Sequence, residues 1–314
     1  MTKNYRGKYA GLLDEAMWGF IDETVAHYPE NAVELSFAEQ RKLYDSLCEQ
    51  FRATRPSKIV VADSVVNTTT HSIPTREYQI PNEQPEAHIL YFHGGGFVVG
   101  GLDSHDDICA ELCAGTRFKV TAIDYRLAPE YVFPAAHEDA VTSFEHLSTA
   151  EPDLPVILVG DSAGANLVAS LSHCARDFPI RPVGQVLIYP CLSRQTTTQS
   201  YQQHSQAPLL TRSDMHFYLD LVMGGQDCAS DVRCFALADS NYSELPITYA
   251  FGASCDPLLD DSRLYCKKIA AAGGQATFVE EQGLVHGYLR ARHTVPQAKE
   301  SFKRIIDACK AVVA

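Results

Sequence analysis

The chain has 314 residues and a formal net charge of −13 at pH 7, from 26 basic against 39 acidic side chains. Because such a surface repels phosphate backbones and anionic lipid, neither nucleic acid nor a membrane surface is an expected partner. Hydrophobic residues make up 46% of the chain and charged residues 21%, which is typical of a globular protein and excludes a disordered one.

Neither a leader nor a metal site is expected. The first residues are basic, but no apolar signal core follows them, and no apolar run approaches the roughly 18 residues of a membrane span. The ten cysteines are scattered along the chain, as expected of small buried side chains in a cytoplasmic protein. Cys109 and Cys113 stand one helical turn apart, but no second Cys or His pair completes a metal site. We therefore expect a cytoplasmic protein without a metal ion or cofactor.

The first part of the chain is predicted to be helical. Apolar residues recur at helical spacing in two stripes, from Leu13 to Phe20 and from Phe37 to Phe51, with Pro29 between them. From Ser57 onward the pattern changes to short strands separated by Asn, Thr and Pro.

Beyond His93, apolar runs typical of strands buried on both faces alternate with helical segments. This alternation predicts an α/β fold, with a mostly parallel sheet covered by helices on both sides. The predicted strands are 59–61 with 65–66, 76–80, 89–92, 120–123, 156–159, 186–189, 247–251 and 276–279. The predicted helices lie around 105–116, 135–148, 163–177, 260–272 and 297–312.

Residues 192–230 interrupt the alternation. The segment is rich in Gln, Thr and Ser, carries one short predicted helix at Met215–Met223, and is too long for an ordinary connection. We interpret it as an insertion that packs with the N-terminal helices as a lid; a mobile surface loop is the alternative.

The candidate nucleophile is Ser162. It lies in Gly160-Asp161-Ser162-Ala163-Gly164, which follows an apolar strand and precedes a helix rich in small residues. This is the G-x-S-x-G pattern in its strand–turn–helix context. The sharp turn lifts the serine hydroxyl clear of the sheet, and the helix N-terminus stabilises negative charge near it.

A second motif, His93-Gly94-Gly95-Gly96-Phe97, follows the predicted strand 89–92. Consecutive glycines let backbone N–H groups approach a ligand closely. We expect the N–H groups of Gly94, Gly95 and Ala163 to form an oxyanion hole. A phosphate-binding loop is the alternative, but neither the P-loop lysine nor a G-x-G-x-x-G spacing is present.

Asp256 and His286 supply the other two groups that a hydrolytic serine needs. Each follows a different predicted strand, and the order Ser162, Asp256, His286 is that of α/β-hydrolases. Because the carboxyl ends of parallel strands meet at one edge of a sheet, we expect these side chains to lie together there.

Other polar residues are assigned structural roles. His93 shapes the glycine loop rather than transferring protons, and Asp161 tunes the serine turn or anchors loops. Asp124 and Arg126 are predicted to hold a loop through an ion pair with each other.

Over residues 73–290 the chain resembles the hormone-sensitive-lipase-like family of α/β-hydrolases, which includes many bacterial carboxylesterases. The resemblance implies the α/β-hydrolase fold, the triad Ser162, Asp256 and His286, and a helical cap. It divides the chain into cap segments 1–55 and 192–230 and core segments 56–191 and 231–314. Tyr288 and Cys255 depart from the family pattern, which puts the acyl pocket or the local packing in doubt. The motifs that carry the resemblance are 73–76, 93–97, 124–130, 133–136, 160–164, 189–190, 256–258 and 286–288.

These features predict a serine carboxylesterase for short- to medium-chain esters, with Ser162 as nucleophile, His286 as base and acid, and Asp256 orienting it. The expected partner is a small-molecule ester. The alternatives are a non-catalytic ligand-binding protein on the same fold, or a lactonase or amidase with the same triad. The oligomeric state is open, and the resemblance makes a homodimer reasonable.

Overall fold

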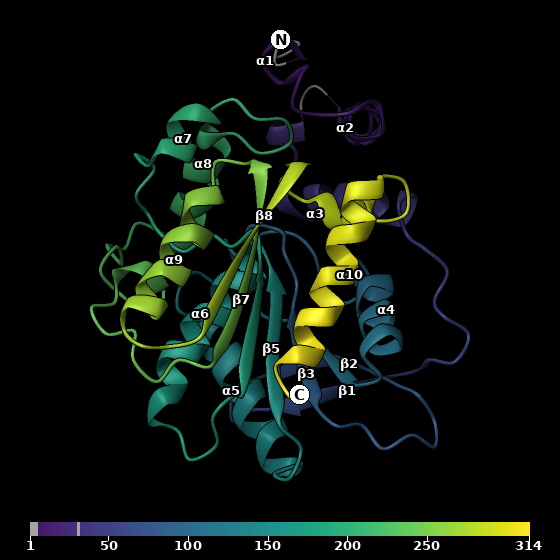
Figure 1. Ribbon diagram of the computed structural model, residues 1–314, viewed down its shortest axis with the longest axis vertical. Helices are drawn as coiled ribbons and strands as arrows, with labels where there is room; N and C mark the ends of the chain where they lie inside the picture. Colours follow the sequence, from purple (N-terminus) through teal and green to yellow (C-terminus); the bar gives the residue numbers. More distant parts are fainter. Residues whose placement is uncertain (1–5, 30–31) are drawn as a thin grey trace.

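The computed structural model describes residues 6–29 and 32–314, and a single eight-stranded sheet crosses the molecule (Figure 1). Its strands are β1 (Val60–Asn67), β2 (Ser72–Gln79), β3 (His88–Phe92), β4 (Lys119–Ile123), β5 (Val156–Asp161), β6 (Gly184–Ile188), β7 (Ile247–Cys255) and β8 (Ala276–Val285). The spatial order is β1-β2-β4-β3-β5-β6-β7-β8, antiparallel at β1–β2 and β2–β4 and parallel from β4 to β8. The predicted mostly parallel sheet is confirmed.

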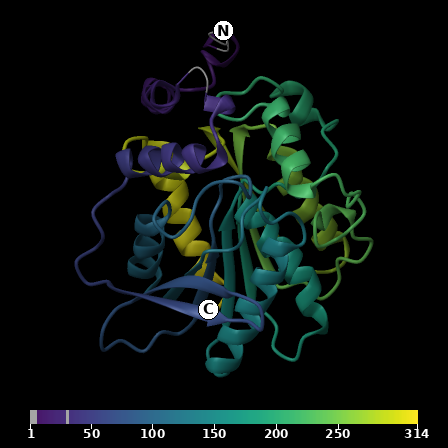
Figure 2. The same cartoon turned by 180° about the vertical axis from the view of Figure 1, so that it is seen from behind.

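Helices cover both faces of the sheet and its carboxyl edge. Their bounds are α1 (Arg6–Tyr9), α2 (Glu15–His27), α3 (Phe37–Gln50), α4 (Asp106–Thr116), α5 (Ala135–Ala150), α6 (Ala163–Cys174), α7 (Gln199–Gln203), α8 (Arg212–Met223), α9 (Leu259–Ala271) and α10 (Pro296–Ala311). Helices α4 and α10 pack on one face, and α5, α6 and α9 pack on the other (Figures 1 and 2).

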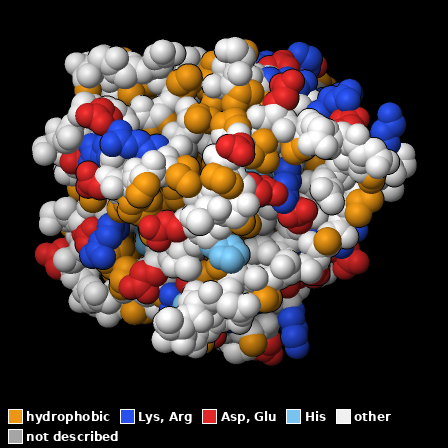
Figure 3. All heavy atoms as spheres, turned by 90° about the horizontal axis from the view of Figure 1, so that it is seen from below, with side chains coloured by type: hydrophobic (Ala, Val, Ile, Leu, Met, Phe, Trp, Pro, Cys, Tyr) orange, Lys and Arg blue, Asp and Glu red, His pale blue; other side chains and the backbone are white. Residues whose placement is uncertain are grey.

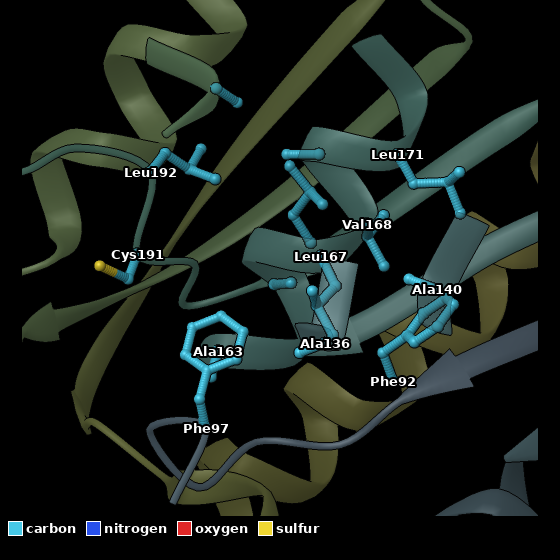
Figure 4. Close-up of a cluster of buried hydrophobic side chains, with 14 of the residues drawn as sticks. Phe92, Phe97, Ala136, Ala140, Ala163, Leu167, Val168, Leu171, Cys191 and Leu192 are labelled. Carbon is cyan, nitrogen blue, oxygen red and sulfur yellow. The ribbon is translucent and has the colours of Figure 1, made fainter. Parts of the chain in front are cut away.

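The strand β5 shows how the sequence builds two cores. Val156 and Leu158 belong to the core beneath α5, α6 and α9, whereas Ile157 and Val159 belong to the core beneath α4 and α10. Successive side chains of a strand point to opposite faces, so a strand buried on both sides must be apolar at every position. Figure 4 shows part of the first core, with labelled side chains of α6 lying beside Ala140 of α5.

Helices α1–α3 and α7–α8 lie beyond the carboxyl ends of the parallel strands (Figures 1 and 2). The two groups touch: Tyr9 Oη and His204 Nδ1 form a buried hydrogen bond of 3.0 Å. The segment 192–230 therefore contacts the N-terminal part of the chain. Helix α8 begins earlier than the predicted Met215, because Thr211 and Asp214 form a reciprocal capping box.

Helix length and surface polarity bear on contact with a membrane. No helix within residues 6–29 and 32–314 is long and apolar enough to cross a bilayer. On the face away from α1–α3, hydrophobic, acidic and basic side chains are interspersed (Figure 3).

Candidate active site

Ser162 lies at a strained turn between β5 and α6. Its φ is 53°, a left-handed conformation, and its N–H donates to the Ile188 carbonyl at 2.9 Å. A Cβ on Gly164 would lie 1.9 Å from the Phe92 carbonyl oxygen, and one on Gly160 would lie 2.6 Å from the Gly164 carbonyl. Both glycines are therefore required sterically, and the hydroxyl of Ser162 stands at the half-buried apex of the turn.

The structure brings Ser162, His286 and Asp256 together. His286 Nε2 lies 2.9 Å from Ser162 Oγ, and His286 Nδ1 lies 2.7 Å from Asp256 Oδ2. Asp256 is fully buried just after β7, and its other oxygen accepts the Leu258 N–H at 2.9 Å. A buried carboxylate in this position fixes the orientation of the imidazole and stabilises its protonated form.

The two departures from the family pattern are absorbed by packing. The Tyr288 hydroxyl is buried and pairs with Ser301 Oγ of α10 at 2.8 Å. Its ring lies edge-on to Tyr189, which in turn lies 4.6 Å from the His286 ring. Burial raises the pKa of the Cys255 thiol to about 11, so this cysteine behaves as a small buried side chain rather than a nucleophile.

Asp161 is a buried anchor for the loops around Ser162. Its Oδ1 accepts the Gly94 N–H at 2.9 Å and the Tyr91 hydroxyl at 2.8 Å, and its Oδ2 accepts the Tyr189 hydroxyl at 3.2 Å. His105 Nε2 lies 3.3 Å from Oδ1. Burial raises the pKa of Asp161, but His105 and these donors outweigh it and hold the pKa well below its usual range. The carboxyl is therefore ionised and structural.

The predicted oxyanion hole needs one correction. The Gly94 N–H is buried and already donates to Asp161, so it cannot also bind a developing oxyanion. Gly95 and Gly96 are partly exposed, with φ of 124° and 61°, and their N–H groups have no acceptor among the described residues. Gly96 is thus a candidate donor that the sequence reasoning missed. The signal was an acidic side chain directly before the serine, because a buried carboxylate needs backbone donors.

Helix α8 closes over this loop. A Cβ on Gly96 would lie 2.6 Å from the Tyr218 ring, so the aromatic face of Tyr218 covers the glycine directly. Phe97, on the same loop, lies beside Ala163 at the start of α6 (Figure 4). The first N–H groups of an α-helix have no partner within the helix, which leaves the Ala163 N–H available to a ligand.

His93 shapes the loop, as expected. Its Nδ1 lies 2.7 Å from the Gly94 carbonyl oxygen, and its ring stacks on Tyr125 at 4.3 Å. Burial lowers the pKa of His93 to about 4, so the imidazole is neutral at physiological pH.

The predicted ion pair between Asp124 and Arg126 is wrong. Arg126 Nε instead donates to both carboxylate oxygens of Asp139, at 3.0 and 2.9 Å. Burial and the neighbouring Asp103 and Asp45 raise the pKa of Asp124 to about 6. Arg126 pairs with Asp139 rather than with Asp124 because Asp139 comes from α5, which packs beneath Arg126. Proximity along the sequence does not reveal that contact.

Potential metal ligands do not cluster in the described part of the chain. Over residues 6–29 and 32–314, no group of three or more His, Cys, Asp or Glu side chains could hold a metal ion.

The fold and the Ser–His–Asp geometry place the chain among α/β hydrolases, and the family model described as alpha/beta hydrolase fold matches residues 89–290. Esterase LipI of Mycobacterium tuberculosis is 36% identical over 81% of this chain and 82% of its own. Ethyl acetate hydrolase of Pseudomonas putida is 30% identical over 78% of this chain and 80% of its own. A hyperthermophilic esterase from the archaeon Pyrobaculum calidifontis superposes with a TM-score of 0.88, at 26% identity, over 96% of this chain and 100% of that one. The chain therefore belongs to the α/β-hydrolase family, within its hormone-sensitive-lipase-like bacterial carboxylesterases.

Proposed function

We propose that this protein hydrolyses small carboxylic esters through an acyl-enzyme on Ser162. The observation that carries the proposal is the continuous hydrogen-bonded chain from Ser162 Oγ through His286 to Asp256, at 2.9 and 2.7 Å. These distances lie within the range needed for proton transfer to a base that a third group orients.

In the first half-reaction, His286 Nε2 accepts the Ser162 proton as Oγ attacks the ester carbonyl carbon. Asp256 holds the proton on Nδ1 and stabilises the imidazolium that forms. The imidazolium then gives its proton to the leaving alcohol oxygen as the carbon–oxygen bond breaks, which leaves the acyl group on Ser162. Water repeats the sequence in the second half-reaction and releases the carboxylic acid.

The developing oxyanion is held by the N–H groups of Gly95, Gly96 and Ala163. Gly94 has a different role, because with Asp161 it fixes the loop so that the next two N–H groups point at the carbonyl oxygen. Donors that are oriented before the reaction lose little free energy on reorganising, and removal of one typically costs about 3–4 kcal/mol of transition-state stabilisation.

The helices beyond the sheet act as a cap over the reacting groups. We assign this cap to residues 1–55 and 192–230 and the hydrolase core to residues 56–191 and 231–314. Tyr218 of α8 lies against Gly96, which limits the room at the oxyanion loop. This closeness favours short- to medium-chain esters over long acyl chains.

The complete triad favours an enzyme over a non-catalytic binding protein. A lactonase or an amidase would use the same three groups, so the leaving group of the substrate distinguishes these activities and the triad does not.

Replacing the nucleophile tests the proposal. Ser162→Ala should lower kcat for p-nitrophenyl butyrate by about 10⁴-fold or more. A phosphonate ester should add covalently to the wild type at Ser162, detected by mass spectrometry, and should leave the alanine variant unmodified. Undiminished turnover by the variant, or an adduct on another residue, would exclude Ser162 as the nucleophile.

A further inference from the structure

Arg290 stands beside the catalytic histidine loop, four residues after His286. Its Nη2 donates to the Tyr44 hydroxyl of α3 at 2.8 Å, and its guanidinium lies 5.0 Å from the centre of the Tyr44 ring. A Cβ on Gly287, the neighbour of His286, would lie 3.2 Å from Arg290 Nη1. The cation therefore lies between helix α3 and the loop that carries His286.

This guanidinium has no carboxylate partner among the described residues. Two residues further on, Arg292 pairs with Asp107 and with Glu111, and on β2 Arg76 pairs with several aspartates. Arg290 Nε, by contrast, is buried with no hydrogen-bond acceptor. A guanidinium carries five N–H donors, and here its contacts are the Tyr44 hydroxyl and the Cys48 thiol, neither of which is a carboxylate.

The groups around Arg290 are those that surround the reacting atoms. Burial raises the pKa values of several tyrosines nearby, and the Arg290 charge opposes that rise at Tyr28, Tyr44, Tyr189 and Tyr218. Two of these rings touch the candidate active site. The Tyr189 ring lies 4.6 Å from the His286 ring, and the Tyr218 ring covers Gly96. The guanidinium therefore lies within electrostatic reach of groups that surround the reacting atoms.

Asp161 is an acidic group within electrostatic reach of Arg290, but no ion pair joins these two described side chains. Its two oxygens already accept from Gly94, Tyr91 and Tyr189. A half-buried cation without a paired anion is costly to desolvate, and an incoming anion removes that cost.

We propose that Arg290 binds a carboxylate carried by the ester substrate. This inference rests on the proposed ester hydrolysis and narrows its substrate class to esters with a free carboxylate, either half-esters of dicarboxylic acids or acyl esters of hydroxy acids. Arginine suits this role because its planar donors match a carboxylate in a two-point contact.

The net charge of −13 does not contradict anion binding. Repulsion between a substrate anion and distant surface charges is screened beyond about 8 Å at physiological ionic strength. Arg290 contacts the loop that carries His286, so its attraction for an anion bound there is screened much less.

Matched esters test the inference. Monoethyl glutarate and ethyl pentanoate differ by a carboxylate in place of a methyl group on the acyl side, and γ-acetoxybutyrate and butyl acetate differ in the same way on the alcohol side. We expect the wild type to have the higher kcat/KM for the charged member of at least one pair. In Arg290→Gln, the charged-to-neutral ratio should fall about 10-fold or more, mainly through KM, because a charge-assisted hydrogen bond is lost.

Arg212→Gln is the matched control, because it removes one exposed positive charge from α8 and should leave the ratio unchanged. Arg290→Lys should restore part of the preference. If Arg290→Gln does not fold, inhibition of the wild type by glutarate replaces it as the test. We expect competitive inhibition that weakens as sodium chloride is raised, and no inhibition by glutarate would overturn the role of Arg290.

The outcomes separate the two proposals. Hydrolysis of the neutral esters without any preference for a charged one, or a ratio that Arg290→Gln leaves unchanged, overturns the role of Arg290 and leaves ester hydrolysis standing. Failure of the wild type to hydrolyse any of the four esters overturns the proposed function itself.

Discussion

Removal of the Asp161 carboxylate should damage stability and catalysis together. Asp161 accepts the Gly94 N–H, the Tyr91 hydroxyl and the Tyr189 hydroxyl, and it faces His105 Nε2 at 3.3 Å. In Asp161→Ala these four groups lose their acceptor in a buried site. An unsatisfied buried donor costs about 1–3 kcal/mol, so four of them set an upper limit near 12 kcal/mol.

Water entering the vacated space would satisfy some of these donors. We therefore expect Asp161→Ala to lower the free energy of unfolding by about 4–6 kcal/mol. Asp161→Asn keeps one acceptor oxygen and should lose about 1–3 kcal/mol. Because Gly94 would no longer be held, the following two N–H groups would move, and kcat should fall by about 10²-fold in the alanine variant.

Urea unfolding and steady-state hydrolysis of p-nitrophenyl butyrate measure both effects. Asp307→Ala is the control, since it removes an exposed carboxylate that pairs with Lys303 and should change stability by less than about 0.5 kcal/mol. One unsatisfied buried donor already costs about 1 kcal/mol or more. A free energy of unfolding for Asp161→Ala within about 1 kcal/mol of the wild-type value would therefore refute the anchoring role.

The same carboxylate predicts a pH dependence. Burial raises the pKa of Asp161, but His105 and the hydrogen-bond donors lower it further, so the folded value lies below the unfolded value of about 3.9. The contribution of ionised Asp161 to the free energy of unfolding is therefore complete above a pH of about 4, and it is lost as the pH falls through the folded pKa. The stability difference between Asp161→Asn and the wild type should shrink in acid.

Backbone strain and a buried acid give two further predictions. Gly96→Ala should lower kcat by about 10²-fold, because its Cβ would lie 2.6 Å from the Tyr218 ring; Gly225→Ala, at φ 80° with open space around it, should lose about 1 kcal/mol of stability and keep kcat. Asp124→Asn should stabilise the protein at pH 8 and not at pH 3, because burial raises the pKa of Asp124 to about 6 and its ionised form is the costly one. Hydrolysis rates check the first pair and urea unfolding at both pH values checks the second; equal rates in the two alanine variants, or a pH-independent effect of Asp124→Asn, would contradict them.

Much of the core architecture could be predicted from the sequence because it follows from burial. A strand apolar at every position, such as Val156–Val159, must be covered on both faces, which fixes a parallel sheet with helices on each side. The placement of Ser162, Asp256 and His286 follows from the same logic, since each comes directly after a strand and the strands end at one edge.

The predictions that failed depend on contacts between distant side chains. Arg126 pairs with Asp139 rather than Asp124 because α5 packs beneath it, and no local pattern encodes that approach. The isolation of Arg290 was invisible for the same reason, because the absence of a nearby carboxylate among the described residues belongs to the packed molecule and not to its neighbours along the chain.

The proposed oxyanion loop was predicted in part: its position follows from the sequence, but the choice of its donors depends on a contact with another segment. Its glycines identify a loop whose backbone can approach a ligand, but they do not show which of its three N–H groups is already bound within the protein. Asp161, fixed in the serine turn, binds the N–H of Gly94, so in the proposed mechanism those of Gly95 and Gly96 are left for the substrate. The residue directly before the nucleophile thus decides which donors of a separate loop are available, so the serine turn and the glycine loop act as one unit.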